Sequence, residues 1–114
     1  MSVKRIRFCQ VNDNNNEMVK FFDALGLVRK SDCEPSTVSG AIFEAGDNWL
    51  EQWQSSEQMP AGLILQLEVD DADVYASNLQ KQGYELYGPM EQHGEKMYFV
   101  TAPNGLQLAV LNKL

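Results

Sequence analysis

The sequence predicts an α+β fold made of two tandem modules, each with the order strand, helix, strand, strand, strand. Segments with strand-like alternation and segments with helical spacing follow one another in that order twice, with a period of roughly 55 residues. A polar stretch, SSEQMPAG, separates the two halves. Because 114 residues suit one domain, we expect a single domain at 1–114, with module one at about 1–56 and module two at about 61–114.

The first module starts with the strand-like segment VKRIRFCQV and continues into a helix over 13–27. Asp13 or Asn14 can cap this helix, Asn14 and Glu17 have the spacing of a weak capping box, and Gly26 ends it. Its apolar side chains recur at helical spacing: Met18, Phe21, Phe22 and Leu25. Three strand-like segments follow, at 27–33, 36–45 and 48–54.

The second module repeats this order. A strand at 62–69 precedes a helix over 70–83, whose acidic first turn suits the positive end of the helix dipole. The apolar stripe of this helix consists of Ala72, Tyr75, Ala76 and Leu79. Three further strands are expected at 84–90, 96–102 and 106–111. In the last strand, Leu108 and Val110 point to one face, and the opposite face carries Gln107, Ala109 and Leu111.

Composition excludes several classes of function. A net charge of −7 argues against nucleic-acid binding, which needs clustered Lys and Arg. No apolar run approaches the ~20 residues that span a bilayer, and the first residues lack a signal-peptide core, so we expect a cytoplasmic protein without a membrane partner. Cys9 and Cys33 are too few for a disulfide framework, and the strand position of Cys9 predicts a buried reduced thiol.

The order of elements, together with FFDALGL, LQLEVDDADVYASNLQKQGY and MYFVTAPNGLQLAVL, resembles the vicinal oxygen chelate superfamily. That superfamily contains glyoxalase I, extradiol dioxygenases, and the bleomycin and fosfomycin resistance proteins. The resemblance covers essentially the whole chain. It implies that the two βαβββ modules form a cupped mixed sheet with the helices on its outer face, and that the ligand site lies in the concavity.

Enzymes of this superfamily hold a divalent metal with a His or Gln on each first strand and a Glu on each last strand. The corresponding positions here are Ile6 or Arg7, Glu51, Ile64 and Ala109, and only Glu51 can bind a metal. The single histidine, His93, lies in a polar loop. The resemblance is therefore closest to the metal-free bleomycin-resistance branch, and we expect no metal, no cofactor and no catalytic residue.

The predicted ligand-binding residues are those that strand alternation points into the cup: Phe8, Trp49, Glu51, Trp53, Ile64, Gln66, Tyr98 and Gln107. Two registers stay open. Either Tyr98 or the pair Met97 and Phe99 faces inward, and a one-residue slip in 48–54 would turn Gln52 inward instead of Glu51.

These residues favour a protein that is not an enzyme and that sequesters a bulky aromatic or cationic compound, such as an antibiotic, as a homodimer. Two alternatives remain. One is a metal-dependent lyase, isomerase or dioxygenase of the same superfamily, and the other is a structural or regulatory homologue without a ligand. The identity of the ligand, its link to antibiotic resistance, and the choice between a domain-swapped and an edge-to-edge dimer do not follow from the sequence.

Overall fold

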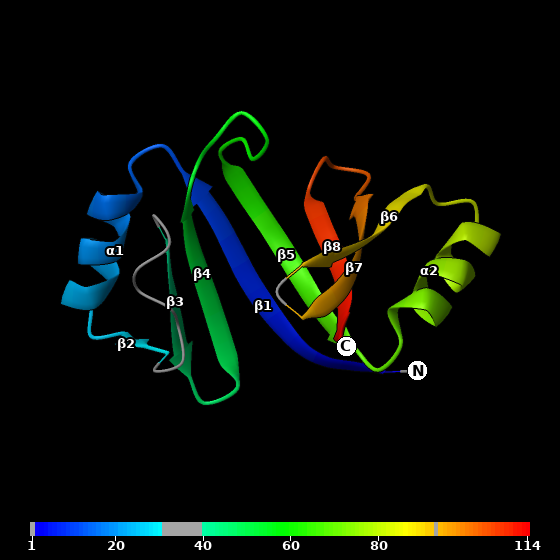
Figure 1. Ribbon diagram of the computed structural model, residues 1–114, viewed down its shortest axis with the longest axis horizontal. Helices are drawn as coiled ribbons and strands as arrows, with labels where there is room; N and C mark the ends of the chain where they lie inside the picture. The colour runs from blue at the N-terminus through cyan, green and yellow to red at the C-terminus, as the bar shows by residue number, and fades with distance from the viewer. Residues whose placement is uncertain (1, 31–39, 93) are drawn as a thin grey trace. The chain divides into compact units, whose positions relative to one another are not determined.

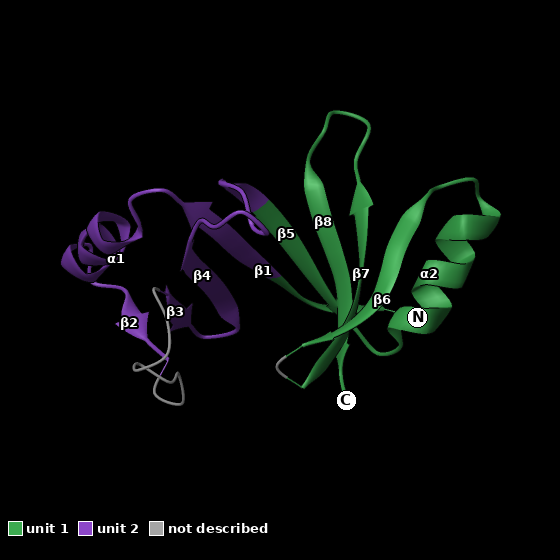
Figure 2. Ribbon diagram, turned by 45° about the horizontal axis from the view of Figure 1, so that its top comes forward, with its two compact units in different colours: residues 1–6, 64–114 green, residues 7–63 purple. Residues whose placement is uncertain are grey.

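A computed structural model describes residues 2–30, 40–92 and 94–114 (Figure 1). These residues form eight strands and two helices, so the predicted α+β class is confirmed. Residues 31–39, with Cys33 and parts of two predicted strands, lie outside the described residues, as does His93. The chain divides into unit 1, residues 1–6 and 64–114, and unit 2, residues 7–63 (Figure 2).

Unit 2 contains one helix and the strands of the first module. Its elements are β1 (Val3–Asn12, from Arg7 onward), α1 (Asn15–Ala24), β2 (Val28–Arg29), β3 (Gly40–Ala45) and β4 (Asn48–Gln54). The strand order is β2-β3-β4-β1, in which β1 runs parallel to β4 and the other neighbours are antiparallel. The parallel pair follows from the crossover through α1.

Unit 1 contains the second helix. Its elements are β5 (Gly62–Val69, from Ile64 onward), α2 (Ala72–Lys81), β6 (Leu86–Gln92), β7 (Glu95–Thr101) and β8 (Gln107–Lys113). The strand order is β5-β8-β7-β6, with β5 parallel to β8 and the other neighbours antiparallel. The two units therefore have the same topology, as the internal repeat predicts.

The repeat can be aligned residue by residue. The helices begin 57 positions apart, at Asn15 and Ala72. Each helix is followed by a glycine with positive φ, Gly26 at 94° and Gly83 at 95°, where a side chain would be strained. From the fourth strand of each unit the offset is 58, because the turn between equivalent positions is one residue longer in unit 1, from Ala102 to Leu106, than in unit 2, from Ala45 to Asn48.

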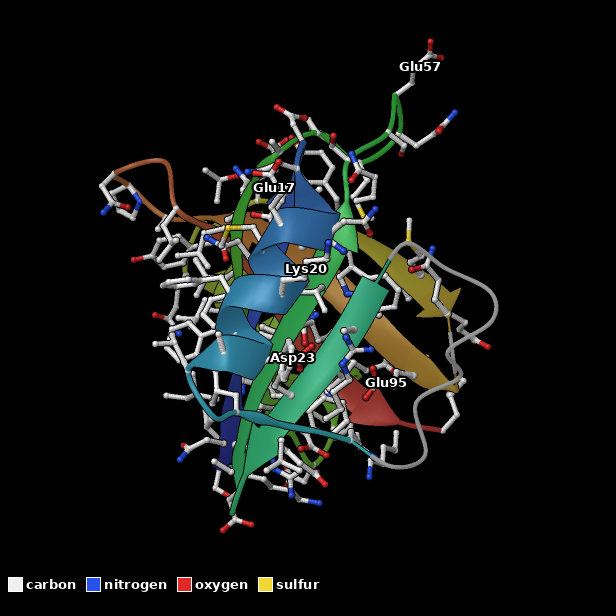
Figure 3. All side chains as sticks on the ribbon, turned by 90° about the vertical axis from the view of Figure 1, so that its left-hand side faces the viewer. Glu17, Lys20, Asp23, Glu57 and Glu95 are labelled. Atoms are coloured by element: carbon white, nitrogen blue, oxygen red, sulfur yellow. The ribbon has the colours of Figure 1, made fainter. Side chains whose placement is uncertain are left out.

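Helix α1 packs on β3 and β4 through part of its predicted apolar stripe. The Phe22 and Phe43 rings lie 5.9 Å apart, and Phe43 is fully buried. Two other members of the stripe, Phe21 and Leu25, are 55% and 61% exposed. The outer side of α1 carries exposed charges, and Figure 3 labels Glu17, Lys20 and Asp23 there.

The start of α1 is held by the sheet rather than by its own capping residue. The side chain of Asn14 forms no cap hydrogen bond and instead donates to Glu17 at 3.4 Å, so the predicted capping box is wrong. The buried Asn12 side chain donates to Asn15 Oδ1 at 3.1 Å and to Gln52 Oε1 at 2.8 Å. This amide cluster lies on the α1 side of the sheet.

Helix α2 has a side-chain cap and an apolar contact face. Asp71 Oδ1 accepts a hydrogen bond from the Val74 backbone N–H at 3.2 Å. A core cluster joins the helix to the sheet, and it contains Val69, Ala72, Val110, Tyr75 and Tyr98. Within the described ranges, neither helix is long and apolar enough to cross a membrane.

Candidate ligand-binding face

One face of the unit 2 sheet is turned away from α1 and carries an acidic residue between two tryptophans. Residues in register lie on the same face of a sheet. Three pairs of β1 and β4 residues share this face: Arg7 with Trp49, Cys9 with Glu51, and Val11 with Trp53. Phe43 and Gln52, which are both fully buried, lie on the opposite face, toward α1.

Both carboxylate oxygens of Glu51 accept hydrogen bonds from indole N–H groups. The Trp49 nitrogen lies 2.9 Å from Oε2, and the Trp53 nitrogen lies 2.8 Å from Oε1. Glu51 is 9% exposed, so these charge-assisted bonds replace water around a carboxylate that is almost buried. The predicted register of 48–54 is confirmed, and the role of these three residues in ligand binding stays a prediction.

The protein itself packs both indole rings. The Arg7 guanidinium carbon and the Lys30 amino nitrogen lie 4.8 and 4.9 Å from the centre of the Trp49 ring, within the range of cation–π contacts. The Trp53 ring lies against the backbone of Gly40, where an added Cβ would be 2.3 Å from a ring carbon. The two indoles are therefore held in fixed orientations.

The predicted face of the first strand is wrong by one residue. Phe8 pairs with Leu50, so its side chain is on the α1 side of the sheet, where it is 47% exposed. Strand alternation shows which residues share a face, but not which face is covered. In β1 the buried face is the one that carries Arg7, which is 2% exposed and is stabilised in part by its contact with the Trp49 ring.

In unit 1, three of the predicted residues share the sheet face opposite α2. Ile64 pairs with Gln107, and Gln66 pairs with Ala109. Val110 instead contacts the α2 side through the core cluster. The predicted division of the last strand into a helix-facing side and an opposite side is thus confirmed.

Of the two orientations left open for 96–102, the structure has the one in which Tyr98 faces α2, so its inclusion among the inward-facing residues is corrected. Tyr98 pairs with Val110 and packs against the α2 core cluster, and its hydroxyl donates to Asp73 Oδ1 at 2.5 Å. Met97 and Phe99 take the other face, with Phe99 beside Ala109. The segment KMYFVTA has apolar side chains on both faces, so its own pattern does not fix its orientation, which follows its pairing with β8.

The Cys9 thiol lies on the same face as Glu51 and is expected to be unreactive. Burial raises its pKa to about 12, and the nearby negative charge of Glu51 acts in the same direction, against a smaller opposing effect of Arg7. The thiol therefore stays protonated at neutral pH, where thiols are poor nucleophiles. The prediction of a buried free cysteine is confirmed.

The residues at the superfamily's metal positions do not fit a metal ion. Three of the four positions carry side chains that cannot coordinate a metal: Arg7 or Ile6, Ile64 and Ala109. At the fourth, each carboxylate oxygen of Glu51 already accepts a hydrogen bond from an indole N–H. In the part of the chain that the structure describes, no group of three or more His, Cys, Asp or Glu is placed to hold an ion. We assign no chemical step to a metal.

Sequence reasoning missed the cations at this face. Arg7 alternates with Cys9 and Val11 along β1, and this alternation is the sequence pattern that predicts its place on the same face. Lys30 gave no signal, because its approach to Trp49 depends on the antiparallel pairing of β2 with β3.

Comparison with known proteins places the fold. No protein-family model and no curated protein matches the chain. A solved structure of an NAD-dependent benzaldehyde dehydrogenase from Legionella pneumophila is similar, with a TM-score of 0.74 and 14% identity over 96% of this chain and 99% of that chain. The structure of a glyoxalase/bleomycin resistance protein/dioxygenase superfamily member from Vibrio splendidus 12B01 is also similar, with a TM-score of 0.70 and 15% identity over 96% of this chain and 98% of that chain. The structure of the 2,3-dioxygenase LapB from Pseudomonas sp. KL28 has a TM-score of 0.67 and 16% identity, over 99% of this chain and 42% of that chain.

These structures define the class of fold. The chain has the mixed α+β fold of the glyoxalase/bleomycin resistance/dioxygenase proteins, which the sequence resemblance implies. At such low identities the likeness shows the fold alone, so the function is argued from the side chains of this chain.

Proposed function

We propose that this chain is a metal-free small-molecule-binding protein of the glyoxalase/bleomycin resistance type, which sequesters a bulky aromatic or cationic compound such as an antibiotic. One observation carries the proposal. The only carboxylate at a superfamily metal position, Glu51, uses both of its oxygens to hold Trp49 and Trp53.

The hydrogen bonds of Glu51 oppose metal binding and favour a fixed aromatic surface. To coordinate an ion, Glu51 would have to give up two charge-assisted hydrogen bonds, each worth about 1.5–3 kcal/mol. The other superfamily positions supply no donors that would offset this loss. The carboxylate therefore positions two indoles instead of an ion.

A fixed indole pair is a suitable surface for a flat ligand. Little conformational entropy is lost when a ring stacks on a side chain that is already held in place. Aromatic stacking contributes ~0.5–1.5 kcal/mol, and a cation over an indole contributes ~0.5–2 kcal/mol. Since Arg7 and Lys30 already lie over Trp49, we expect a cationic group of the ligand to act mainly at Trp53. The net charge of −7 favours the approach of such a ligand.

Fluorescence titration tests this proposal directly, because the only two tryptophans of the chain, Trp49 and Trp53, lie on this face. The probes are 9-aminoacridine, a planar cation, and acridone, a neutral ring system of similar size. We expect saturable quenching, with an affinity that falls about tenfold or more in Trp53→Leu. The matched control is Phe21→Leu, which removes an exposed aromatic ring from α1 and should leave the affinity unchanged. Equal affinity in Trp53→Leu and wild type would contradict the proposal.

Elemental analysis tests the metal-free part of the proposal. Purified wild-type protein should contain no stoichiometric zinc, iron, manganese or nickel. If wild type contains one of these metals and Glu51→Ala loses it, the chain is a metalloprotein and the proposal fails.

We propose that the protein associates with itself as a homodimer. Several apolar side chains of unit 2 are about half exposed or more, and a second copy would cover them: Phe8, Leu25 and Val28. Analytical ultracentrifugation should give twice the 12.9 kDa mass of the chain. A monomer at micromolar concentration would contradict this proposal without affecting ligand binding.

A further inference from the structure

An open apolar pocket of about 210 Å³ lies in unit 1, on the side of the sheet that α2 covers. None of its lining side chains is charged, and only two carry a hydroxyl group. The lining consists of Leu67, Leu79, Tyr84, Val100, Thr101, Ala102, Pro103, Leu108 and Val110. The predicted ligand residues Ile64, Gln66 and Gln107 point to the opposite face of the same strands, so this pocket is a separate site.

The internal repeat shows what fills the matching place in unit 2. At the offset of 57, Leu79 corresponds to Phe22 and Val100 corresponds to Phe43. In unit 2 these two rings lie 5.9 Å apart, and Phe43 is fully buried. Unit 1 has the same backbone arrangement with two smaller aliphatic side chains. Two positions of the pocket lining therefore carry smaller side chains than the equivalent positions of unit 2, where aromatic rings pack between the helix and the sheet.

We propose that the unit 1 pocket binds a small uncharged aromatic molecule, whose ring takes the place that the Phe43 ring holds in unit 2. The volume is sufficient, since an apolar cavity of about 150 Å³ can hold benzene. The lining selects against a charged ring, because none of its side chains carries a charge that could pair with it. Tyr84, which is 50% exposed, adds an aromatic ring to the wall.

Toluene is a suitable probe, and methyl-detected NMR of the full chain is a suitable readout. We expect saturable toluene-induced shifts at the methyl groups of Leu79, Val100 and Leu108, with nuclear Overhauser contacts from the ring protons of toluene to these methyls. Val100→Phe introduces the residue that unit 2 has at Phe43, and it should lower the toluene affinity at least about tenfold. The same variant should raise the melting temperature, because it fills the pocket.

The matched control is Val74→Phe. It makes the same substitution on the same unit, at a valine of α2 that is 42% exposed and does not line the pocket. This variant should bind toluene as the wild type does. If Val100→Phe does not fold, Leu79→Phe, which copies Phe22, is tested in the same way.

Three outcomes overturn the proposal. The first is the absence of saturable shifts at the pocket methyls up to the solubility limit of toluene. The second is unchanged toluene binding in Val100→Phe. The third is a response confined to residues of unit 2, which would concern the indole face instead. The nuclear Overhauser contacts decide the case in wild-type protein even if both filling variants fail to fold.

Discussion

Asn112 Oδ1 accepts a hydrogen bond from the backbone N–H of Ala72 at 2.7 Å, so the last strand of unit 1 holds the first residue of α2. Unit 2 contains the corresponding bond, from the backbone N–H of Asn15 to Gln54 Oε1 at 3.2 Å. The first N–H groups of a helix have no partner within the helix. In both units a side-chain amide of the fourth strand supplies the partner.

Replacing Asn112 with alanine should destabilise the protein by about 1–2 kcal/mol, because it leaves the partly buried N–H of Ala72 without an acceptor. Urea unfolding measures this change. Asn112→Asp is the control, since it keeps an oxygen at this place and puts a negative charge near a helix N-terminus, where it is favourable. A destabilisation of Asn112→Asp as large as that of Asn112→Ala would contradict the explanation.

Asp73 should make the stability of the protein depend on pH. The hydrogen bond from the Tyr98 hydroxyl and then that from the Lys96 amino group lower the pKa of Asp73 below 3.8. A carboxyl whose pKa is lower in the folded state stabilises the fold above its unfolded pKa, and this contribution is lost as the pH falls through the folded pKa. Asp73→Asn should therefore reduce stability near neutral pH and have less effect in acid below 3.8.

Urea unfolding at several pH values checks this expectation. Tyr98→Phe should weaken the pH dependence, because it removes the largest cause of the pKa shift of Asp73. Glu57→Gln is the control, since Glu57 is exposed and projects away from the strands and helices in Figure 3. Equal effects of Asp73→Asn at neutral and acid pH would show that the pKa of Asp73 is not shifted.

Gly40→Ala should destabilise the protein by about 1–3 kcal/mol, because the new methyl group would overlap the Trp53 ring. The measurement is again urea unfolding, together with the change in tryptophan emission. In a Trp53→Ala background the same substitution should cost much less, since the obstructing ring is gone. Costs that simply add would show that Gly40 and Trp53 do not interact in this way.

Cys9 should resist alkylation in the folded protein. Its thiol is buried and its pKa is raised to about 12, so little thiolate forms at neutral pH. The experiment uses Cys33→Ser, in which Cys9 is the only thiol, and measures iodoacetamide labelling by mass spectrometry. Labelling should be slow in buffer and fast in urea. Rapid labelling of the folded variant would contradict the burial of Cys9.

Most of the fold can be predicted from the sequence, because periodicity and glycine positions are local signals. The helix stripe of 70–83, the glycines that follow both helices, and the opposite directions of Gln107 and Val110 all follow from spacing alone. The repeated topology then follows from the order of the elements. The burial of the helix 13–27 stripe is less predictable, because Phe21 and Leu25 are apolar and still exposed.

The details of the candidate site depend on contacts between distant residues. Alternation places Phe8 and Arg7 on opposite faces of the strand but does not show which face is buried, and in the structure Arg7 is buried against Trp49. Tyr98 faces α2 because it pairs with Val110, which packs against the helix, and there its hydroxyl donates to Asp73, 25 positions earlier. The unit 1 pocket is lined by Leu79 and Val100, where unit 2 has the larger Phe22 and Phe43, and no sequence motif predicts a pocket of this kind.

Between equivalent positions, Ala102 to Leu106 in unit 1 and Ala45 to Asn48 in unit 2, the turn from strand three to strand four is one residue longer in unit 1, yet the strand pairing beyond it is equivalent. Two different turn lengths are therefore compatible with the same alignment of these strands. The shorter version, at Gly46–Asp47, is a practical place to insert an epitope tag or a peptide for site-specific dye attachment. Gly46 and Asp47 are both exposed, and neither lines the apolar pocket of unit 1.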